Sequence, residues 1–232
     1  MYYPYVVVGA GITGIVIAER LSLLTGFSVL LIEKRDHVGG NLHDEYNEHG
    51  ILVHQYGPHI VHTNDESVWS YLSQFTEWYP VQIKVKAMIN GVYASIPINI
   101  KTMKELYNKD FTPEQMRNYF DGFSIHSTGE CESAEDYLIS HVGVDLYSKI
   151  YRDYIKKQWD TETKNIDISI VKRLPIRFSN DDRYFHDRFQ GVPKLGYHRM
   201  FKKMLIHKNI SLMLNTPFNE IAKKIKFNHL FF

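Results

Sequence analysis

Three glycines near the start of the chain have a spacing that indicates a chemical function more clearly than any other pattern in the sequence. They lie in the segment Gly9-Ala10-Gly11-Ile12-Thr13-Gly14. The pattern G-x-G-x-x-G is typical of loops that bind dinucleotides. In such a loop Gly9 permits a tight turn, Gly11 lets the backbone approach a pyrophosphate, and Gly14 lets a helix pack closely on a strand. The phosphates then lie at the positive end of the helix dipole. A glycine-rich turn that binds nothing is the competing interpretation, and the surrounding elements decide between them.

The elements around these glycines form the unit that such a loop requires. An apolar, β-branched run over residues 5–8 predicts a buried parallel strand. Apolar residues recur at helical spacing over residues 11–24, and a second strand is predicted over 29–32. Glu33 follows this strand, where an acidic residue is expected to hold the ribose hydroxyls. A nucleotide site on a parallel sheet with a right-handed crossover is therefore favoured.

The segment from Glu33 to Asn41 indicates which of two common dinucleotides, NAD or FAD, the glycine loop would bind. It reads Glu-Lys-Arg-Asp-His-Val-Gly-Gly-Asn, an acidic residue followed by a basic pair and a double glycine. This resembles the extended signature of FAD-binding flavoproteins of the amine-oxidase type. Paired glycines let a loop backbone lie close to the cofactor's pyrophosphate. FAD is therefore favoured over NAD.

The remaining patterns predict a second region and a return to the first. Residues 35–63 have little periodicity and are expected to be loops laid over a site. Asn90-Gly91 predicts a type I′ hairpin within residues 87–96. Capping signals at Thr112–Gln115 and Ser133–Asp136 predict two helices. Further predicted elements are a helix from Asp145 to Trp159, a helix over 196–207, and strands over 210–214 and 226–232.

These elements predict an α/β fold: a Rossmann-like FAD-binding βαβ domain with a mostly helical inserted domain and additional antiparallel strands. Residues 1–99 are expected to form the first part of the FAD-binding domain, with the hairpin. Residues 100–165 are expected to form the helical insert. Residues 166–232 are expected to contain a substrate loop, strands and an incomplete return to the FAD-binding domain.

Composition and charge restrict the classes of function. A formal net charge of +1 gives no electrostatic reason to expect nucleic acid or an anionic membrane as a partner. Cys131 is the only cysteine, which excludes an internal disulfide and fits a reducing compartment. No apolar run approaches the roughly 18 residues of a membrane span, and no signal peptide is visible. The sequence therefore predicts a cytoplasmic protein.

Residues 53–63, Val-His-Gln-Tyr-Gly-Pro-His-Ile-Val-His-Thr, contain three histidines that could suggest zinc. The Gly-Pro between them interrupts a helical ligand face, and neither a carboxylate nor a cysteine accompanies them at ligand spacing. No metal site is predicted. The segment instead closely resembles the loop that UDP-galactopyranose mutases lay against the isoalloxazine ring of FAD.

Further segments match this family in the same order along the chain. They are Ser95–Asn99, Lys157–Trp159, Lys172–Phe178, Asp181–Phe185 and Phe189–Lys194. The resemblance covers essentially all of the chain, but only the amino-terminal portion of the family, whose members run well past residue 232. We therefore expect a truncated form that binds FAD weakly or not at all and has little activity.

The resemblance implies an isomerase, an intramolecular transferase that interconverts UDP-galactopyranose and UDP-galactofuranose for surface polysaccharides. In this family N5 of reduced FAD attacks the anomeric carbon, UDP leaves, the sugar adduct opens, and the ring recloses as a furanose. Family members are commonly oligomeric, so a homo-oligomer is possible. The preference between galactose and its N-acetyl derivative, and the source of the flavin reductant, stay open.

The resemblance also assigns site residues by position. Tyr154 would stack on uracil, with Trp159 beside the nucleotide and sugar, and Arg173 would reach the diphosphate and stabilise the departing UDP. The cofactor-binding set is Gly9, Gly11, Thr13, Gly14, Glu33, Lys34, Gly40, Asn41, His59 and Ile60; the substrate-binding set is Tyr154, Trp159, Arg173, Tyr184 and Phe185; and the catalytic set is Arg173, His59 and His62, with both histidines at the flavin face.

Other interpretations stay open at this point. Tyr154 and Trp159 could be ordinary helix packing, and Arg173 could be a solvated charge. The glycine motifs alone would also fit a redox flavoenzyme of the amine-oxidase type, or a non-catalytic nucleotide-binding fragment.

Overall fold

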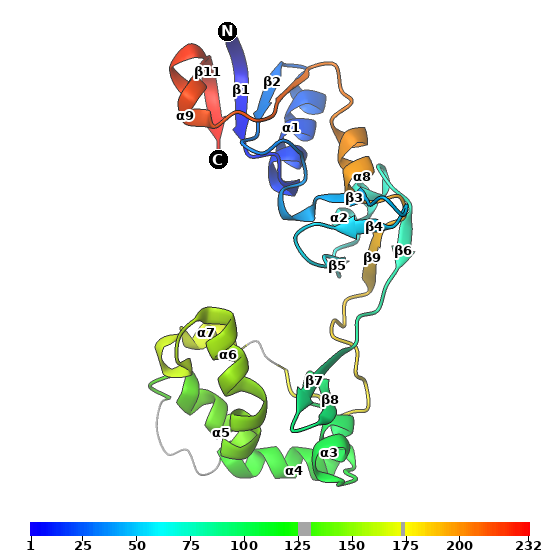
Figure 1. Ribbon diagram of the computed structural model, residues 1–232, viewed down its shortest axis with the longest axis vertical. Helices are drawn as coiled ribbons and strands as arrows, with labels where there is room; N and C mark the ends of the chain where they lie inside the picture. Colours follow the sequence, from blue (N-terminus) through cyan, green and yellow to red (C-terminus); the bar gives the residue numbers. More distant parts are fainter. Residues whose placement is uncertain (125–130, 173–174) are drawn as a thin grey trace. The chain divides into compact units, whose positions relative to one another are not determined.

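A four-stranded parallel sheet forms the centre of the first of two compact units (Figure 1). The computed structural model describes residues 1–124, 131–172 and 175–232. The strands are β1 (Tyr2–Val8), β2 (Val29–Ile32), β10 (Ile210–Met213) and β11 (Lys226–Phe231), in the order β10-β2-β1-β11. Val6 of β1 pairs with Leu30 of β2 on one side and with Leu230 of β11 on the other.

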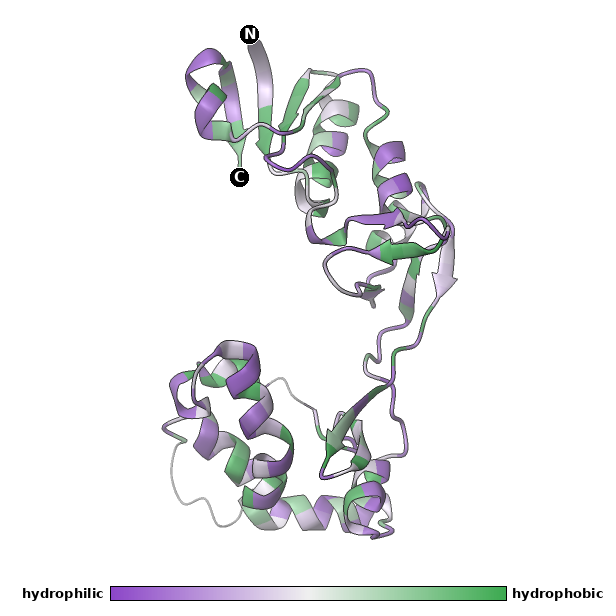
Figure 2. Ribbon diagram, viewed as in Figure 1, coloured by the Kyte–Doolittle hydropathy of each residue, from purple (hydrophilic) through white to green (hydrophobic). Residues whose placement is uncertain are grey.

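Both faces of this sheet are buried, as the continuous apolar runs of β1 and β2 predict. Val7 and Leu31 point to one face, where they pack with residues of α1 (Ile12–Thr25) and α8 (Tyr197–Met204). Val6 and Leu30 point to the other face and pack near α9 (Phe218–Ile221). Strand β2 is accordingly hydrophobic along its whole length (Figure 2). The βαβ unit and the Rossmann-like α/β fold class expected from the sequence are confirmed.

The same unit contains short strands in the segment that the sequence predicted as loops. Strand β3 (Asp44–Tyr46) pairs with β4 (Leu52–His54), and β5 (Val61–Thr63) pairs with β9 (Phe189–Pro193). The loop prediction for residues 35–63 is therefore wrong for these strands. Three residues are too few to show an alternating pattern, and the partner of β5 lies far along the chain. The unit also contains strand β6 (Trp78–Pro80), helix α2 (Glu66–Ser73) and the 3₁₀ turns Gly40–Leu42 and Ala222–Lys224.

The second unit begins with the predicted hairpin. Strands β7 (Val85–Ile89) and β8 (Val92–Ile96) are joined by Asn90 and Gly91, with φ of 50° and 82°. Positive φ at both positions is what a type I′ turn requires, so this prediction is confirmed. Helix α3 (Ile100–Tyr107) packs against β8, and its first turn is capped by Asn99.

Helices make up most of the remainder of this unit. They are α4 (Pro113–Ser124), α5 (Ala134–Leu146), α6 (Arg152–Trp159), α7 (Ile168–Lys172) and the 3₁₀ turn Thr163–Asn165. The predicted caps at Thr112 and Ser133 are present. The single helix expected from Asp145 to Trp159 is corrected: α5 ends at Leu146, and a π-helical turn over Tyr147–Tyr151 leads into α6.

The contacts divide the chain into residues 1–81 with 187–232, and residues 82–186. The hairpin groups with the helices because α3 and the π-helical turn pack on it. The sequence predicted three domain ranges, 1–99, 100–165 and 166–232, and these stay a prediction. Their boundaries differ from those of the two compact units. Among the described residues, no helix is long and apolar enough to cross a bilayer.

Candidate cofactor and substrate site

Two adjoining cavities lie at the carboxyl ends of β1 and β2, and each has a volume of about 580 Å³. Open parallel sheets bind their ligands at this edge. The first cavity is lined by Glu33, Lys34, Gly40, Thr216 and Phe218, among others, and the second by Gly11, Thr13, Gly14, Gly39 and His59, among others. Val8, Gly9, Asn41 and Phe232 line both. Most of the predicted cofactor residues therefore share one surface.

The three motif glycines have different surroundings. Gly9 has a φ of +97°, and its N–H donates to the carbonyl of Ile32 at 2.7 Å. A Cβ on Gly14 would lie 1.9 Å from the oxygen of Gly9, so only glycine lets α1 pack this closely. A Cβ on Gly11 would meet no protein atom within 4 Å. Gly11 therefore leaves room on the side of the cavity, where the pyrophosphate of a ligand could approach the protein backbone.

The amino end of α1 lies at the second cavity, which Gly11, Ile12 and Thr13 line. Gly11 is the N-cap residue, the first turn contains no acidic residue, and among the described residues no side chain caps the helix. The N–H groups at such a helix end, together with the helix dipole, favour an anion. A pyrophosphate is the anion that the glycine spacing predicts.

The double glycine lies against this turn. The N–H of Gly39 donates to the carbonyl of Ala10 at 2.7 Å, and a Cβ on Gly40 would lie 3.2 Å from the Cα of Gly11. Gly39 and Gly40 have φ values of +100° and +58°, which glycine adopts at little cost. The two glycine motifs that the sequence singled out separately are thus in direct contact.

Glu33 is buried, with 6% of its surface exposed, and two backbone groups hold its carboxylate. The N–H of Ala10 donates to Oε2 at 2.8 Å, and the N–H of Arg35 donates to Oε1 at 2.9 Å. Glu33 therefore ties the glycine turn to the end of β2. It also lines the first cavity, where a ribose contact stays a prediction.

The histidines of residues 53–63 have different positions. His59 lines the second cavity, its Nδ1 lies 2.9 Å from the carbonyl of Gly57, and its own carbonyl accepts from Tyr197. His62 lies on β5 and pairs through Nδ1 with Asp187 at 2.8 Å. Neither His62 nor Ile60 is among the residues that line the two cavities.

The sequence reasoning missed a third segment of the first cavity. Thr216, Phe218 and Asn219 line it directly after β10. Their signal was positional, because the carboxyl ends of parallel strands meet at one edge of a sheet. The order of β10 next to β2, which brings them there, was not visible in the local pattern.

The predicted substrate residues lie in the second unit. On α6 Tyr154 and Trp159 are 57% and 48% exposed, whereas Ile155 is buried at 2%. Ile155 supplies the contact of this helix with the core, so packing does not account for the two aromatic side chains. Arg173 lies outside the described residues.

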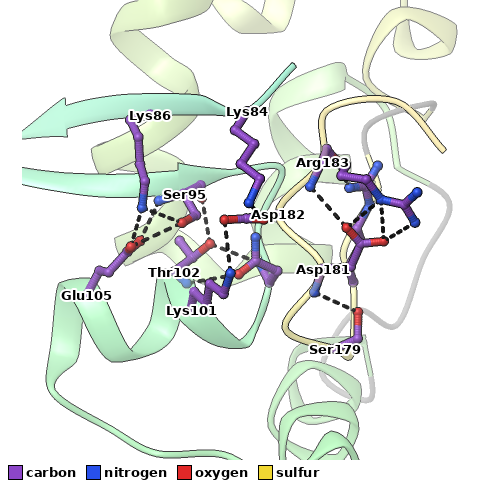
Figure 3. A network of polar contacts seen from close by, with 12 residues as sticks. Lys84, Lys86, Ser95, Lys101, Thr102, Glu105, Ser179, Asp181, Asp182 and Arg183 are labelled. Atoms are coloured by element: carbon purple, nitrogen blue, oxygen red, sulfur yellow. Dashed lines mark hydrogen bonds and ion pairs between the residues drawn. The ribbon is translucent and has the colours of Figure 1, made fainter. Parts of the chain in front are cut away.

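Tyr184 and Phe185 follow residues whose polar contacts hold their loop to Lys84, just before the hairpin, and to Lys101 of α3. Figure 3 shows these contacts at Asp182. Asp182 pairs with Lys84 and Lys101, both at 3.0 Å. The N–H of Tyr184 donates to the carbonyl of Ile83 at 2.7 Å. The rings of Tyr184 and Phe185 meet edge to face at 4.9 Å.

Ion pairs and hydrogen bonds of charged side chains also hold the loop that carries Tyr184 and Phe185. Hydrogen bonds from Lys101 and Lys84 lower the pKa of Asp182 to about 2. Asp181 binds Arg183 at 2.7 Å, and this hydrogen bond holds the pKa of Asp181 well below its usual range. The Arg177 guanidinium donates to the carbonyls of Arg183 and Tyr184. Six charged side chains outside the aromatic pair, Lys84, Lys101, Arg177, Asp181, Asp182 and Arg183, therefore hold this loop in place.

Replacing Asp182 with asparagine is expected to loosen this loop with little effect on overall stability. Partly exposed ion pairs contribute about 1 kcal/mol or less each. A loss of about 1 kcal/mol in local stability exposes the loop roughly five times more often. Tryptic cleavage after Arg183 should accelerate by that factor, measured by mass spectrometry. Asp121→Asn, on the exposed face of α4, is the control, and equal cleavage rates in both variants would contradict the role of Asp182.

Comparisons with known proteins show which families this chain resembles. A family model described as UDP-galactopyranose mutase matches residues 149–232, and one described as an NAD(P)-binding Rossmann-like domain matches residues 7–75. A protein of Klebsiella pneumoniae named "Probable UDP-galactopyranose mutase" is 41% identical over 213 residues, which are 91% of this chain and 55% of that protein. The chain is a relative of the UDP-galactopyranose mutases.

Two further relatives extend the comparison. A dTDP-fucopyranose mutase of Escherichia coli is 37% identical over 97% of this chain and 61% of its own length. A UDP-galactopyranose mutase of Mycoplasma pneumoniae is 34% identical over 95% of this chain and 56% of its own length. The chain thus spans between 55% and 61% of the length of these curated relatives.

Solved structures support the fold. A crystal structure of reduced UDP-galactopyranose mutase has a TM-score of 0.66 at 18% identity, over 97% of this chain and 48% of that one. A putrescine oxidase variant has a TM-score of 0.55 at 17% identity, over 94% of this chain and 51% of that one. The two neighbours share the Rossmann-like architecture with this chain and carry different names.

Proposed function

We propose that the protein is an FAD-dependent mutase that interconverts UDP-galactopyranose and UDP-galactofuranose. The observation that carries this proposal is the open face of Gly11, which meets a cavity of about 580 Å³ beside the Gly39–Gly40 loop. A 41% identical relative named as a probable mutase of this kind makes a flavin the dinucleotide to expect there. The activity, like the substrate, is a proposal for the whole protein.

The residues around the cavities fit FAD. The uncapped amino end of α1 and the Gly39–Gly40 loop would receive the pyrophosphate, and Glu33 would receive the ribose. Lys34 and Asn41 line the first cavity, and Thr13 and His59 line the second, which would hold the flavin end. Reduced FAD, when bound, would supply the nucleophile for the anomeric carbon.

The second unit would bind the sugar nucleotide. We propose that Tyr154 stacks on uracil and that Trp159 borders the nucleotide and sugar, which gives their exposure on α6 a purpose. Tyr184 would donate its hydroxyl to the diphosphate, with Phe185 beside it. Arg173 would hold the diphosphate and stabilise the UDP that departs, since a guanidinium forms paired hydrogen bonds with phosphate oxygens. His62 and Ile60 keep their proposed roles at the flavin on resemblance alone.

A second candidate has support of its own. The Escherichia coli relative is named as a dTDP-fucopyranose mutase, and it is nearly as similar to this chain as the first relative. The two functions use the same ring contraction and differ in the base and the sugar. Parallel assays with UDP-galactose and dTDP-fucose decide between them.

The test begins with the purified protein and its visible spectrum after incubation with FAD. Absence of FAD binding at up to about 1 mM would reject flavin-dependent activity in this chain and would agree with the expectation of a truncated form that does not bind FAD. If FAD binds, the titration measures whether binding is as weak as the sequence predicted. The protein is then reduced with dithionite and given UDP-galactopyranose, and a furanose product is sought by chromatography. Product that forms only with reduced FAD supports a mutase. Consumption of an electron acceptor would instead indicate a redox flavoenzyme.

Replacing Tyr154 with alanine is expected to weaken UDP binding without destabilising the protein. Stacking of a base on an aromatic ring contributes about 1–3 kcal/mol, so the dissociation constant should rise at least about fivefold. Isothermal titration with UDP measures it. The control is Tyr93→Ala, since this tyrosine on β8 is similarly exposed at 62%. The same loss in both variants would argue against a uracil site at Tyr154.

A further inference from the structure

Three histidines of the first unit pack together next to the double-glycine loop. The rings of His37 and His43 stack at 3.8 Å between centroids, with 20° between their planes. The ring of His198, at the start of α8, meets His43 edge-on at 5.6 Å. In the part of the chain that the structure describes, no set of three metal-ligating side chains is placed to hold an ion. The cluster therefore calls for another explanation.

Two of these rings converge on a single backbone oxygen. The Nδ1 atoms of His37 and His43 each lie 3.1 Å from the carbonyl oxygen of Val38. A carbonyl oxygen only accepts hydrogen bonds, so both imidazoles donate to it from Nδ1, and its two lone pairs allow this. Nε2 of His37 then accepts from the hydroxyl of Tyr56 at 2.9 Å. The hydrogen bonds thus determine the tautomer of both rings.

The oxygen that they hold belongs to the peptide between Val38 and Gly39. A fixed orientation of this peptide restricts the backbone of Gly39, whose φ of +100° is one of many that a glycine can adopt. The N–H of Gly39 binds the carbonyl of Ala10 in the glycine turn, and Gly40 contacts Gly11. Gly39 and Gly40 each line one of the two cavities. The two imidazoles therefore act on the wall of the cofactor site.

His43 is itself anchored to the core of the unit. It is 8% exposed, and the neighbouring Asp44 accepts from the N–H groups of Tyr197 and His198 at 2.6 and 2.8 Å. Burial lowers the pKa of His198, and nearby Lys202 adds to the effect, which favours the neutral form of this ring.

We propose that His37 and His43 are positioning residues that hold the Gly39–Gly40 loop in the shape that receives the cofactor's pyrophosphate. Neither residue touches the cofactor in this account. The inference rests on the proposed function only in taking FAD as the ligand of the cavities. It gives a role to His37, within the Glu33–Asn41 segment, and adds His43, which lies outside that segment.

The test distinguishes the effect of the Nδ1–H donor of His43 from the effect of its ring stacking. His43→Phe keeps a ring that can stack but removes the donor, whereas His43→Asn places an amide N–H near the position of Nδ1. We expect His43→Phe to weaken FAD binding about tenfold and His43→Asn to bind within about threefold of the unaltered protein. Flavin fluorescence titrations measure affinity, and thermal unfolding without cofactor shows that each variant folds.

The outcomes distinguish this inference from the proposed function. No FAD binding by the unaltered protein rejects the proposed function. Binding by that protein and by His43→Phe with equal affinity rejects the positioning role, as does an equal loss in the Phe and Asn variants. His49→Phe is the control, because His49 is 73% exposed on a turn outside the cluster. If His43→Phe does not fold, the same pair of substitutions at the less buried His37 makes the same test.

Discussion

Replacing Gly11 with valine is expected to weaken FAD binding about 100-fold and leave the thermal stability of the protein unchanged. Gly11 has a φ of −71°, which valine adopts readily, and a Cβ there meets no protein atom within 4 Å. The fold therefore tolerates the side chain. The methyl groups of valine would fill the space that the pyrophosphate needs next to the protein backbone. A loss of about 100-fold in affinity corresponds to roughly 2.7 kcal/mol of binding free energy.

Flavin fluorescence titration and thermal unfolding of the same preparation check both halves of this result. The matched control is Gly122→Val, since Gly122 on α4 also has open space around its Cα. That change should leave FAD affinity as it is. Normal FAD affinity in Gly11→Val would show that the cofactor does not approach the turn at Gly11, and the placement of the pyrophosphate would have to be abandoned.

Replacing Gly14 with alanine should lower the stability of the protein as well as its affinity for FAD. The added Cβ would lie 1.9 Å from the oxygen of Gly9 and 3.3 Å from Cγ1 of Val7. Both atoms belong to β1 and its turn, so α1 has to move away from the sheet. Overpacking of this kind costs roughly 3 kcal/mol, which for a protein of this size lowers the melting temperature by about 6–12 °C.

Differential scanning calorimetry measures the change in Gly14→Ala, and the FAD titration should show a weaker complex because the displaced helix carries the anion-binding N–H groups. The melting temperatures and FAD affinities of Gly14→Ala and Gly11→Val should be compared directly. If both variants lost only affinity, the close contact of α1 with Gly9 would not be a feature of the folded protein in solution.

Local interactions explain which elements were predictable from the sequence. The type I′ turn at Asn90-Gly91 depends on the φ preferences of two adjacent residues, and the cap at Thr112 depends on a hydrogen bond to Gln115 three residues away. The βαβ unit depends on apolar runs and on a glycine spacing within about thirty residues. Each of these signals lies within a short window, so propensity and spacing were enough.

Contacts between distant segments explain what was missed. The pairing of β5 with β9 and the contact of Asp182 with Lys84 and Lys101 join segments that carry no local mark of each other. The wall formed by Thr216, Phe218 and Asn219 depends on β10 pairing with β2. Sequence spacing alone does not determine such neighbours.

The sequence by itself therefore determined the glycine turn, the acidic residue after the second strand and the helical character of the middle of the chain. Only the tertiary structure decided that the two glycine motifs touch, that His59 rather than His62 lines a cavity, and that His37 and His43 share one carbonyl. The first group depends on backbone preferences within a few residues. The second depends on packing partners such as Asp44 and His198, which are 154 positions apart and meet only in the folded chain.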